Sequence, residues 1–356
     1  MHLEDGYIPE EYTRYIGRKI ALIGAGLVLL FFLFVISLSL GAVRIPLRDV
    51  FAALFSGAGE RRWDIIIRNI RLPQALAAIV SGAGLAVAGA AMQSILRNPL
   101  GSPFTLGISN AAAFGAAFSV MIIGTGAMRS TAADAVVISN PYATTFSALL
   151  FCLLATGVIL AIARIKRASP EVMILTGVAL GALFTAGTMF LQYFADDVQL
   201  AAMVFWTFGD VARASWSELA IISVVTGAAS IYFIFNRWNY NAINAGDETA
   251  RGLGVPVDQI RLIGMVVASL VTATIISFVG IIGFVGLVCP HMVRRLIGDD
   301  HRFLIPGTLV TGALLLLGAD TVARIMLAPN VLPVAILTAF LGAPVFIYLL
   351  IKGYRR

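Results

Sequence analysis

The most suggestive charged residue within the apolar stretches of this sequence is Asp320. Arg324 follows four residues later, so on a helix the two side chains lie on the same face and can pair. An ionisable group inside a membrane span is costly and is often kept for proton or ion coupling. Asp320 is therefore a candidate proton carrier. A structural ion pair near one end of a span explains the same spacing, and we favour that interpretation.

Two other kinds of chemistry find little support. His291 lies two residues after Cys289, but one histidine and one cysteine are too few ligands for a transition-metal site, and we expect no metal there. A G-x-x-x-x-G-K-[ST] loop for ATP is absent, because none of the three lysines, Lys19, Lys166 and Lys352, follows a glycine. No cluster of His, Asp, Glu or Cys with acid–base spacing falls in the apolar stretches. We predict a protein that is not an enzyme and holds no cofactor of its own.

Composition places the chain in a lipid bilayer. Hydrophobic residues make up 59% of the 356 residues and charged residues 12%, whereas globular domains average about 45–50% and about 25%. The apolar residues recur in blocks of about 20, the length that a helix needs to cross a hydrocarbon core of about 30 Å. The predicted fold class is an all-α, polytopic membrane protein with about ten transmembrane helices.

The ten predicted spans are 20–41, 74–96, 104–124, 143–163, 171–195, 216–236, 259–280, 283–296, 304–326 and 333–351. The eighth is short and contains Pro290 and His291, so a half-helix buried in protein is an alternative there.

Charges outside the spans predict the orientation. With a cytoplasmic N-terminus, most of the 25 arginines and lysines fall on the inner side, as the positive-inside rule requires. We therefore expect a multi-pass protein of the inner (cytoplasmic) membrane with both termini in the cytoplasm. Residues 1–19 are predicted to be a cytoplasmic N-terminal segment and residues 20–356 the transmembrane domain. The net charge of +6 follows from this topology and does not indicate nucleic-acid binding.

One outer segment departs from this charge rule. Between residues 41 and 72 the sequence has six arginines and three acidic residues, on the side that should be poor in positive charge. The arginines are Arg44, Arg48, Arg61, Arg62, Arg68 and Arg71, and the acidic residues are Asp49, Glu60 and Asp64. Because the inner side is rich in positive charge elsewhere, we interpret this outer surface as a site for an acidic partner rather than as evidence for the opposite orientation.

A polar segment interrupts the apolar blocks at about residues 236–259. Its centre reads GDETARGLG from Gly246 to Gly254. Asp247 and Glu248 suit the N-terminus of a short helix that ends near residues 252–254, because carboxylates are favourable at that end of the helix dipole. A charged helix held at the membrane surface between two spans is predicted to be gripped by a soluble partner.

Eight motifs, in order along the chain, resemble one family of membrane proteins. They are IRLPQALAAIVSGAGLAVAGAAMQSILRNPLGSP, LGISNAAAFGA, LTGVALGALFTA, FWTFGD, GDETARGLGV, IIGFVGLVCPHMVRRLIGDDHRFLIPG, ADTVAR and LTAFLGAPVFIYLLIKG. From about Ile70 to Lys352 the chain is similar to the FecCD family, the membrane subunits of ABC importers for iron chelates, haem and vitamin B12, and in particular to its vitamin B12 members.

The resemblance implies a type II ABC importer permease, in which two copies of a ten-helix subunit form the substrate pathway. It also implies two cytoplasmic ATP-binding-cassette ATPases, which bind the ATP and Mg, and an extracytoplasmic substrate-binding protein that delivers the cargo. The spans would then alternate access to the two sides as the ATPases open and close. Which chelate is carried is not predicted, because iron-siderophore, haem and corrinoid importers share the fold.

Functional residues follow from the motifs that match. The resemblance implies that the polar segment contacts the ATPase through Gly246, Asp247, Glu248, Ala250, Leu253 and Gly254. It implies docking of the binding protein on Arg71 and Arg324. Vitamin B12 members carry a further arginine where this chain has Gln74, and Arg68, one turn before Arg71, could substitute for it.

The inner gate of the family matches the loop before the fifth predicted span, which makes Ser169 the gate candidate. The same serine directly precedes Pro170, so it could equally be an ordinary helix N-cap. For the whole chain, a proton-coupled secondary transporter that uses Asp320 remains the alternative function.

Overall fold

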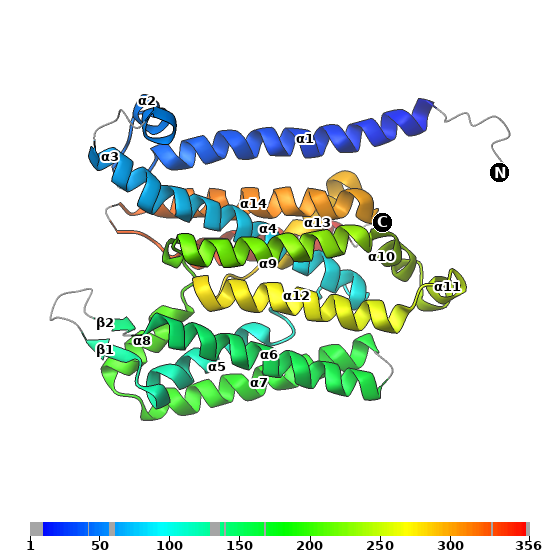
Figure 1. Ribbon diagram of the computed structural model, residues 1–356. Coiled ribbons are helices and arrows are strands. Elements are labelled where there is room, and N and C mark those ends of the chain that lie inside the picture. The colour runs from blue at the N-terminus through cyan, green and yellow to red at the C-terminus, as the bar shows by residue number, and fades with distance from the viewer. Residues whose placement is uncertain are drawn as a thin grey trace.

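The computed structural model describes residues 10–41, 43–56, 61–128, 136–138, 140–166, 169–328 and 330–353. Among these residues, seven helices are long and apolar enough to cross a membrane, and they run roughly side by side (Figure 1). They are α1 (Glu10–Ser39), α4 (Leu72–Ile95), α6 (Pro141–Ile165), α7 (Pro170–Phe194), α9 (Trp216–Phe235), α12 (Val257–Val279) and α14 (His301–Met326). Residues 1–9 and 354–356, which hold the start of the predicted N-terminal segment and the last two arginines, lie outside the described residues, as does Glu60.

An all-α architecture of about ten membrane helices, as predicted, is present in the described residues, although not all ten are full-length spans. Each of the seven long helices, with α4 counted together with the turns before it, is long and apolar enough to cross a membrane. Three further apolar helices complete the ten: α5 (Ile108–Phe118), extended by the π-helical turn η3 (Ser119–Ile123), α13 (Val285–Ile297) and α15 (Val334–Gly353). Helix α13 is about 20 Å long, too short to span the hydrocarbon core, and contains Pro290, as the short eighth span indicated.

Several elements were not predicted. The outer segment folds into α2 (Leu47–Phe51), η1 (Ala52–Ser56), α3 (Arg61–Ile66) and η2 (Ile67–Arg71), and α3, η2 and α4 run on without a break. Elsewhere the structure adds α8 (Asp197–Thr207), η4 (Val211–Arg213) and a hairpin of β1 (Gly126–Met128) and β2 (Val136–Ile138). Residues 10–19 are the first turns of α1, so the helix shows no break at the boundary drawn after residue 19.

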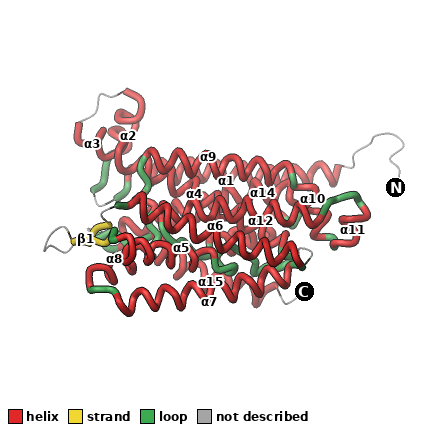
Figure 2. Tube along the Cα trace, turned by 60° about the horizontal axis from the view of Figure 1, so that its bottom comes forward, coloured by secondary structure: helices red, strands yellow, loops and turns green. Residues whose placement is uncertain are grey.

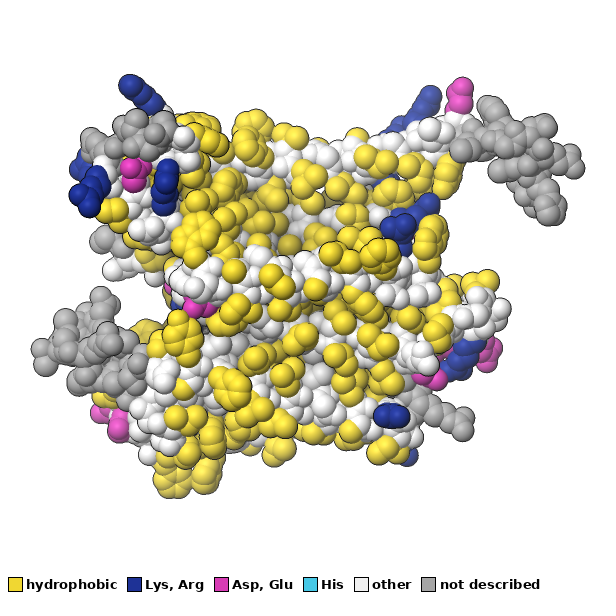
Figure 3. Space-filling view, in the orientation of Figure 1, with side chains coloured by type: hydrophobic (Ala, Val, Ile, Leu, Met, Phe, Trp, Pro, Cys, Tyr) yellow, Lys and Arg dark blue, Asp and Glu magenta, His cyan; other side chains and the backbone are white. Residues whose placement is uncertain are grey.

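The short elements gather at the two ends of the bundle. Helices α10 (Arg237–Asn244) and α11 (Asp247–Gly252) lie at the same end as the start of α1, whereas α2, α3, α8 and the hairpin lie at the other (Figures 1 and 2). Following the predicted orientation, we call the α11 end the inner end and the α2–α3 end the outer end. Hydrophobic side chains cover most of the surface between the ends, and arginines and lysines collect at them (Figure 3).

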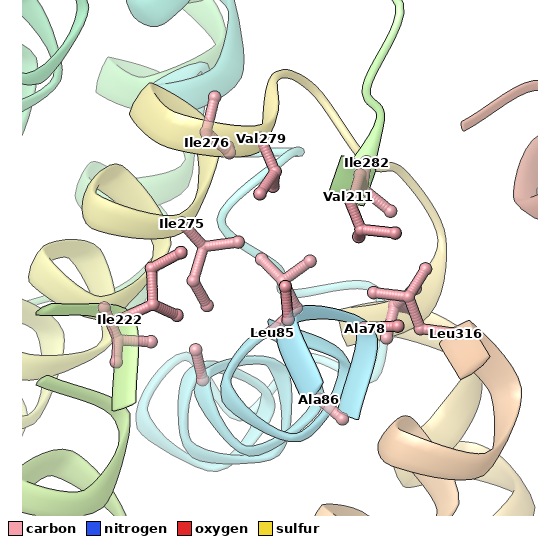
Figure 4. Packing of buried hydrophobic residues seen from close by; sticks show 14 of the residues in the cluster. Ala78, Leu85, Ala86, Val211, Ile222, Ile275, Ile276, Val279, Ile282 and Leu316 are labelled. Atoms are coloured by element: carbon pink, nitrogen blue, oxygen red, sulfur yellow. The ribbon is translucent and has the colours of Figure 1, made fainter. Parts of the chain in front are cut away.

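Helix α4 is the centre of the packing. Most of its residues are buried against α9, α12, α13 and α14. Leu85 and Ala86 of α4 meet Ile275 of α12 and Leu316 of α14 in the core (Figure 4). A Cβ atom on Gly89 would lie 1.7 Å from the carbonyl oxygen of Gly286, so only glycine lets the backbones of α4 and α13 approach so closely. By contrast, α1 and α7 are mostly exposed, which leaves their apolar faces for lipid or for another subunit.

Candidate coupling segment and outer-end arginines

The predicted short helix in the polar segment is present as α11. Gly246 precedes it with φ of +119°, a conformation that favours glycine, and the helix runs from Asp247 to Gly252. Ala250 is buried against neighbouring residues of the same segment, whereas Glu248 is exposed and the Leu253 side chain is 70% exposed. The segment therefore presents both an acidic and an apolar side chain outside the bundle.

Asp247 points into the protein rather than outward. Arg261, in the second turn of α12, binds both carboxylate oxygens of Asp247 at 3.0 and 2.9 Å. The same guanidinium is only 1% exposed and donates through Nε to the carbonyl oxygen of Ile95, 2.8 Å away at the end of α4. The hydrogen bonds from Arg261 hold the pKa of Asp247 below its usual value, so the carboxylate stays charged.

We call Asp247, Arg261 and the Ile95 carbonyl the inner tie. It joins the first residue of α11 to α12 and to the C-terminal end of α4, where carbonyl groups lack helical partners and attract cations. Arg97 adds a longer contact to Asp247, with 3.7 Å between Nη1 and Oδ1. The sequence pattern indicated Asp247 as part of the segment, but nothing in it distinguished Arg261 from the other arginines at the inner end.

A second polar contact holds α10 against the bundle. The buried His301 ring lies 2.8 Å from Asn241 through Nδ1 and 2.7 Å from Ser94 of α4 through Nε2. Because the Asn241 oxygen can only accept, Nδ1 carries the proton, and Nε2 accepts from the Ser94 hydroxyl. Asn241 also donates to Asp300, at 3.0 Å. The polar segment is thus anchored to α4 at two places.

The predicted docking arginines Arg71 and Arg324 are buried at the outer end. Arg324 pairs with Asp320 at 3.0 Å, and Asp320 also accepts a hydrogen bond from Gln74 at 2.9 Å. Arg71 and Arg324 are each 6% exposed and Asp320 is 2% exposed. We call these four residues the outer tie. The structural ion pair that the sequence favoured for Asp320 is therefore present, one helical turn apart on α14.

Other donors of the outer tie bind backbone at and just after the C-terminal end of α1. Arg71 donates to the carbonyl oxygens of Leu38 and Ser39 at 2.7 and 2.8 Å and also to that of Val43. Arg324 donates to the backbone and side-chain oxygens of Ser37. Both guanidiniums therefore face inward, and their predicted docking role stays a prediction.

Arg68 and Ser169 lie near the surface. Arg68 is exposed and donates through Nε to the carbonyl oxygen of Ala53, at 2.7 Å. Ser169 immediately precedes α7, which starts at Pro170, at the inner end of the bundle. Its hydroxyl bonds Glu171 instead of a helix N–H, so it occupies the N-cap position without forming a side-chain cap. Among the residues that the structure describes, no contact of Ser169 indicates a gate, and that role also stays a prediction.

His291 is used inside the fold. Its Nε2 lies 2.9 Å from the carbonyl oxygen of Pro99, and its ring stacks at a tilt on Phe346, with centroids 5.6 Å apart. Among the described residues no three His, Cys, Asp or Glu side chains come together as metal ligands.

The arrangement is that of an ABC transporter permease: a polytopic helical bundle with a protruding short helix at one end and arginines at the other. A solved metal-chelate type ABC transporter in an inward-facing conformation has a TM-score of 0.80 to this structure. The two are 29% identical, over 93% of this chain and 99% of that one. The model of the FecCD transport family matches residues 29–352, and this chain belongs to that family.

Individual relatives agree with this assignment. An ABC transporter permease protein of Methanocaldococcus jannaschii is 54% identical over 98% of this chain and 99% of the relative. The haemin transport system permease of Yersinia pestis is 34% identical over 93% of this chain and 95% of the relative. The predicted family and the type II importer permease fold are therefore confirmed.

Proposed function

We propose that two copies of this chain form the membrane pathway of an importer for a metal chelate. The cargo would be an iron siderophore, haem or a corrinoid such as vitamin B12, handed over at the outer end by a substrate-binding protein. Two ATP-binding-cassette ATPases, with ATP and Mg²⁺, would bind at the inner end. The chain would sit in the cytoplasmic membrane with its termini inside. Family membership and a relative that transports haemin support this class of cargo.

The observation that carries the proposal is the position of α11. It protrudes from the inner end with Glu248 and Leu253 exposed, yet its first residue is fixed to α4 by the inner tie. A surface that is exposed on one side and rigidly fixed on the other suits a segment through which a soluble ATPase moves the spans. Gly246, Ala250 and Gly254 shape this segment and do not need to touch the partner.

Cysteine cross-linking tests the contact. A cysteine in place of Leu253 should cross-link to the ATPase subunit of the assembled transporter, and closing the ATPases with ATP and vanadate should change the yield. The native Cys152 and Cys289 are buried and should not compete. Ile123→Cys, exposed at the outer end, is the matched control and should give no product. Failure of Leu253→Cys to cross-link to any subunit would contradict the proposal.

Proton-coupled transport through Asp320 has weaker support, because Arg324 and Gln74 already bind that carboxylate in a buried structural network. Uptake that needs the ATPase and stops with vanadate would decide against it. Uptake by the purified chain under an imposed pH gradient, without an ATPase, would decide for it.

A further inference from the structure

One lysine is buried at the inner end of α1 without an acidic partner. Lys19 is 5% exposed, and its Nζ atom lies 4.1 Å from the centroid of the Tyr15 ring and 5.1 Å from that of Phe303. Within the described part of the chain, no carboxylate oxygen lies within 4.0 Å of this nitrogen. Aromatic faces attract a cation but carry no net charge. Because a buried charge without a counter-charge is costly, an external anion beside Lys19 would be stabilising.

A second cation lies beside the same Phe303 ring. The guanidinium carbon of Arg302 is 5.3 Å from the centroid of this ring, and its Nη1 lies 3.5 Å from the Tyr12 hydroxyl. The charge of Arg302 is matched within the chain, because its Nη2 lies 2.6 Å from a carboxylate oxygen of Asp300. Lys19 is therefore the cation in excess. We call the following residues the inner cation cluster: Tyr12, Tyr15, Lys19, Arg302 and Phe303.

The end of α13 closes this cluster on one side. A Cβ atom on Gly298 would lie 3.6 Å from Nζ of Lys19 and 3.9 Å from the Tyr15 hydroxyl, so the lysine lies against the C-cap of α13. The C-terminal end of a helix is favourable for a cation, but it carries only about half an elementary charge. The helix end therefore neutralises Lys19 in part and leaves room for a full negative charge.

Helix length places the cluster at the depth of the lipid head groups. Lys19 and Ser39, the last residue of α1, are about 30 Å apart at about 1.5 Å per residue, which equals the thickness of the hydrocarbon core. By the same measure Arg302 and Arg324 are about 33 Å apart along α14. Trp238 lies 5.1 Å from the Arg302 guanidinium, and tryptophan is enriched where a membrane meets water. Both cations therefore lie at the boundary of the core where lipid phosphates begin.

The surface that leads away from the cluster is apolar. Ile20, Leu22 and Leu27 of α1 are 58%, 47% and 53% exposed. In Figure 3 yellow side chains continue along α1 and along the surface between α1 and α9, and dark blue side chains lie at the inner end of that surface. An acyl chain could lie on this surface while its head group reaches Lys19. A free anion would use only the charge, and a soluble protein would not reach the apolar part.

We propose that the inner cation cluster binds the phosphate of an acidic phospholipid from the leaflet at the inner end of the bundle. Lys19 supplies the counter-charge, and the Tyr12 hydroxyl and Arg302 are neighbouring donors. A zwitterionic lipid is less suitable, because its own ammonium group competes with Lys19 for the phosphate. The bound head group would fasten the first turns of α1 to α14 and, through Asp300 and Asn241, to α10. This site goes beyond the proposed function, since it needs neither cargo nor ATPase.

The test measures lipid binding to the full chain in detergent by native mass spectrometry, with phosphatidylglycerol, phosphatidylcholine and inorganic phosphate as probes. Phosphatidylglycerol should bind the wild type more tightly than phosphatidylcholine does. K19M keeps an apolar side chain of similar length and should weaken phosphatidylglycerol binding about fivefold or more. K19R keeps the charge and should retain most of the affinity. K166M removes an exposed lysine at the inner end of α6 and should behave as the wild type.

A photoactivatable phosphatidylglycerol tests the site without any substitution. With the reactive group in its head, it should label residues 10–20 or 298–303 of the wild type. Label confined to other parts of the chain, or equal phosphatidylglycerol binding by K19M and wild type, would overturn the proposal. If K19M bound this lipid normally but lost the ATPase subunit, the cluster would be a protein contact instead.

Thermal unfolding separates the lipid from the two remaining explanations. Phosphatidylglycerol should raise the unfolding temperature of the wild type more than that of K19M. Stabilisation by inorganic phosphate alone that K19M abolishes would mean that the ligand is a free anion, contrary to the proposal. An equal loss of stability in K19M with and without phosphatidylglycerol would mean that Lys19 serves only the packing of α1, and would also overturn it.

Discussion

The two ends of α4 use arginine in different ways. At the inner end one guanidinium joins one carboxylate and one carbonyl, and Asp247 is 26% exposed on a helix that protrudes from the bundle. At the outer end Arg324 pairs with Asp320 and Arg71 binds backbone carbonyls, and all three side chains are nearly inaccessible to solvent. The inner tie therefore connects a surface element to the spans, whereas the outer tie holds spans to one another. We infer that movement of the ATPase reaches the spans through the inner tie. The outer tie keeps the spans packed against one another.

The largest expected effect comes from breaking the inner tie. R261M removes both hydrogen bonds to Asp247 and the one to Ile95, and the loss of hydrogen bonds to a charged, partly buried group costs about 1.5–3 kcal/mol. Because α11 would still be exposed, the ATPase should still bind and hydrolyse ATP, but uptake should fall by about 100-fold or more. Parallel assays of ATPase activity and uptake in proteoliposomes measure this uncoupling.

R261K is the matched control, since it keeps the charge but loses the bidentate geometry. It should retain part of the uptake. Equal loss of ATP hydrolysis and uptake in R261M would show that the tie serves assembly rather than transmission.

Variants of the outer tie should lower the stability of the fold, as expected for a structural element. Removing the carboxylate in D320N leaves two buried guanidiniums without a counter-charge, whereas R324M leaves one cation and one anion. We expect D320N to lower the free energy of unfolding by about 3 kcal/mol and R324M by less. The double variant should be less destabilised than the sum of the two, by about 0.5–3 kcal/mol. Thermal unfolding of the wild type, the two single variants and the double variant in detergent measures this double-mutant cycle.

Transport by these variants separates the outer tie from a proton relay. At a temperature where D320N is folded, uptake should remain and should still depend on ATP. Folded D320N protein with no uptake would support Asp320 as a coupling group. The outer tie would then not be a purely structural element, and its contrast with the inner tie would be lost.

A smaller effect is expected at the surface of α11. L253A removes most of an exposed apolar side chain, so the stability of the chain alone should change by less than about 0.5 kcal/mol. ATPase affinity should nevertheless fall several-fold, by about 1 kcal/mol, if Leu253 sits in the partner. F235A removes an apolar side chain at the end of α9 that is 80% exposed, against 70% for Leu253, and serves as the control. Equal affinity of L253A and wild type would place the contact elsewhere on the segment.

The contrast between the ends also shows how far the sequence alone could lead. Spans and the bounds of α11 follow from local patterns: apolar blocks, carboxylates at a helix start and glycines at its ends. Helix α8 carried a readable signal, because Asp196 and Gln199 form a capping box, but it follows α7 closely and was overlooked. Of the two ties, only the Asp320–Arg324 pair carried such a signal, in its spacing of four residues. Gln74 meets Asp320 across 246 positions, and Arg71 meets Leu38 across 33, so only the packed helices reveal that these groups turn inward.

The least conspicuous expected effect concerns pH at the inner tie. The pKa of Asp247 is lowered from 3.8 by Arg261, so its contribution to stability is complete above about pH 5 and is lost only as pH falls through the lowered value. The difference in unfolding temperature between wild type and D247N should therefore be constant from about pH 5 to about pH 8 and shrink only below about pH 4. A difference that changed near neutral pH would mean that another titrating group controls the inner end, and the Asp247–Arg261 pair would no longer account for the rigid base of α11.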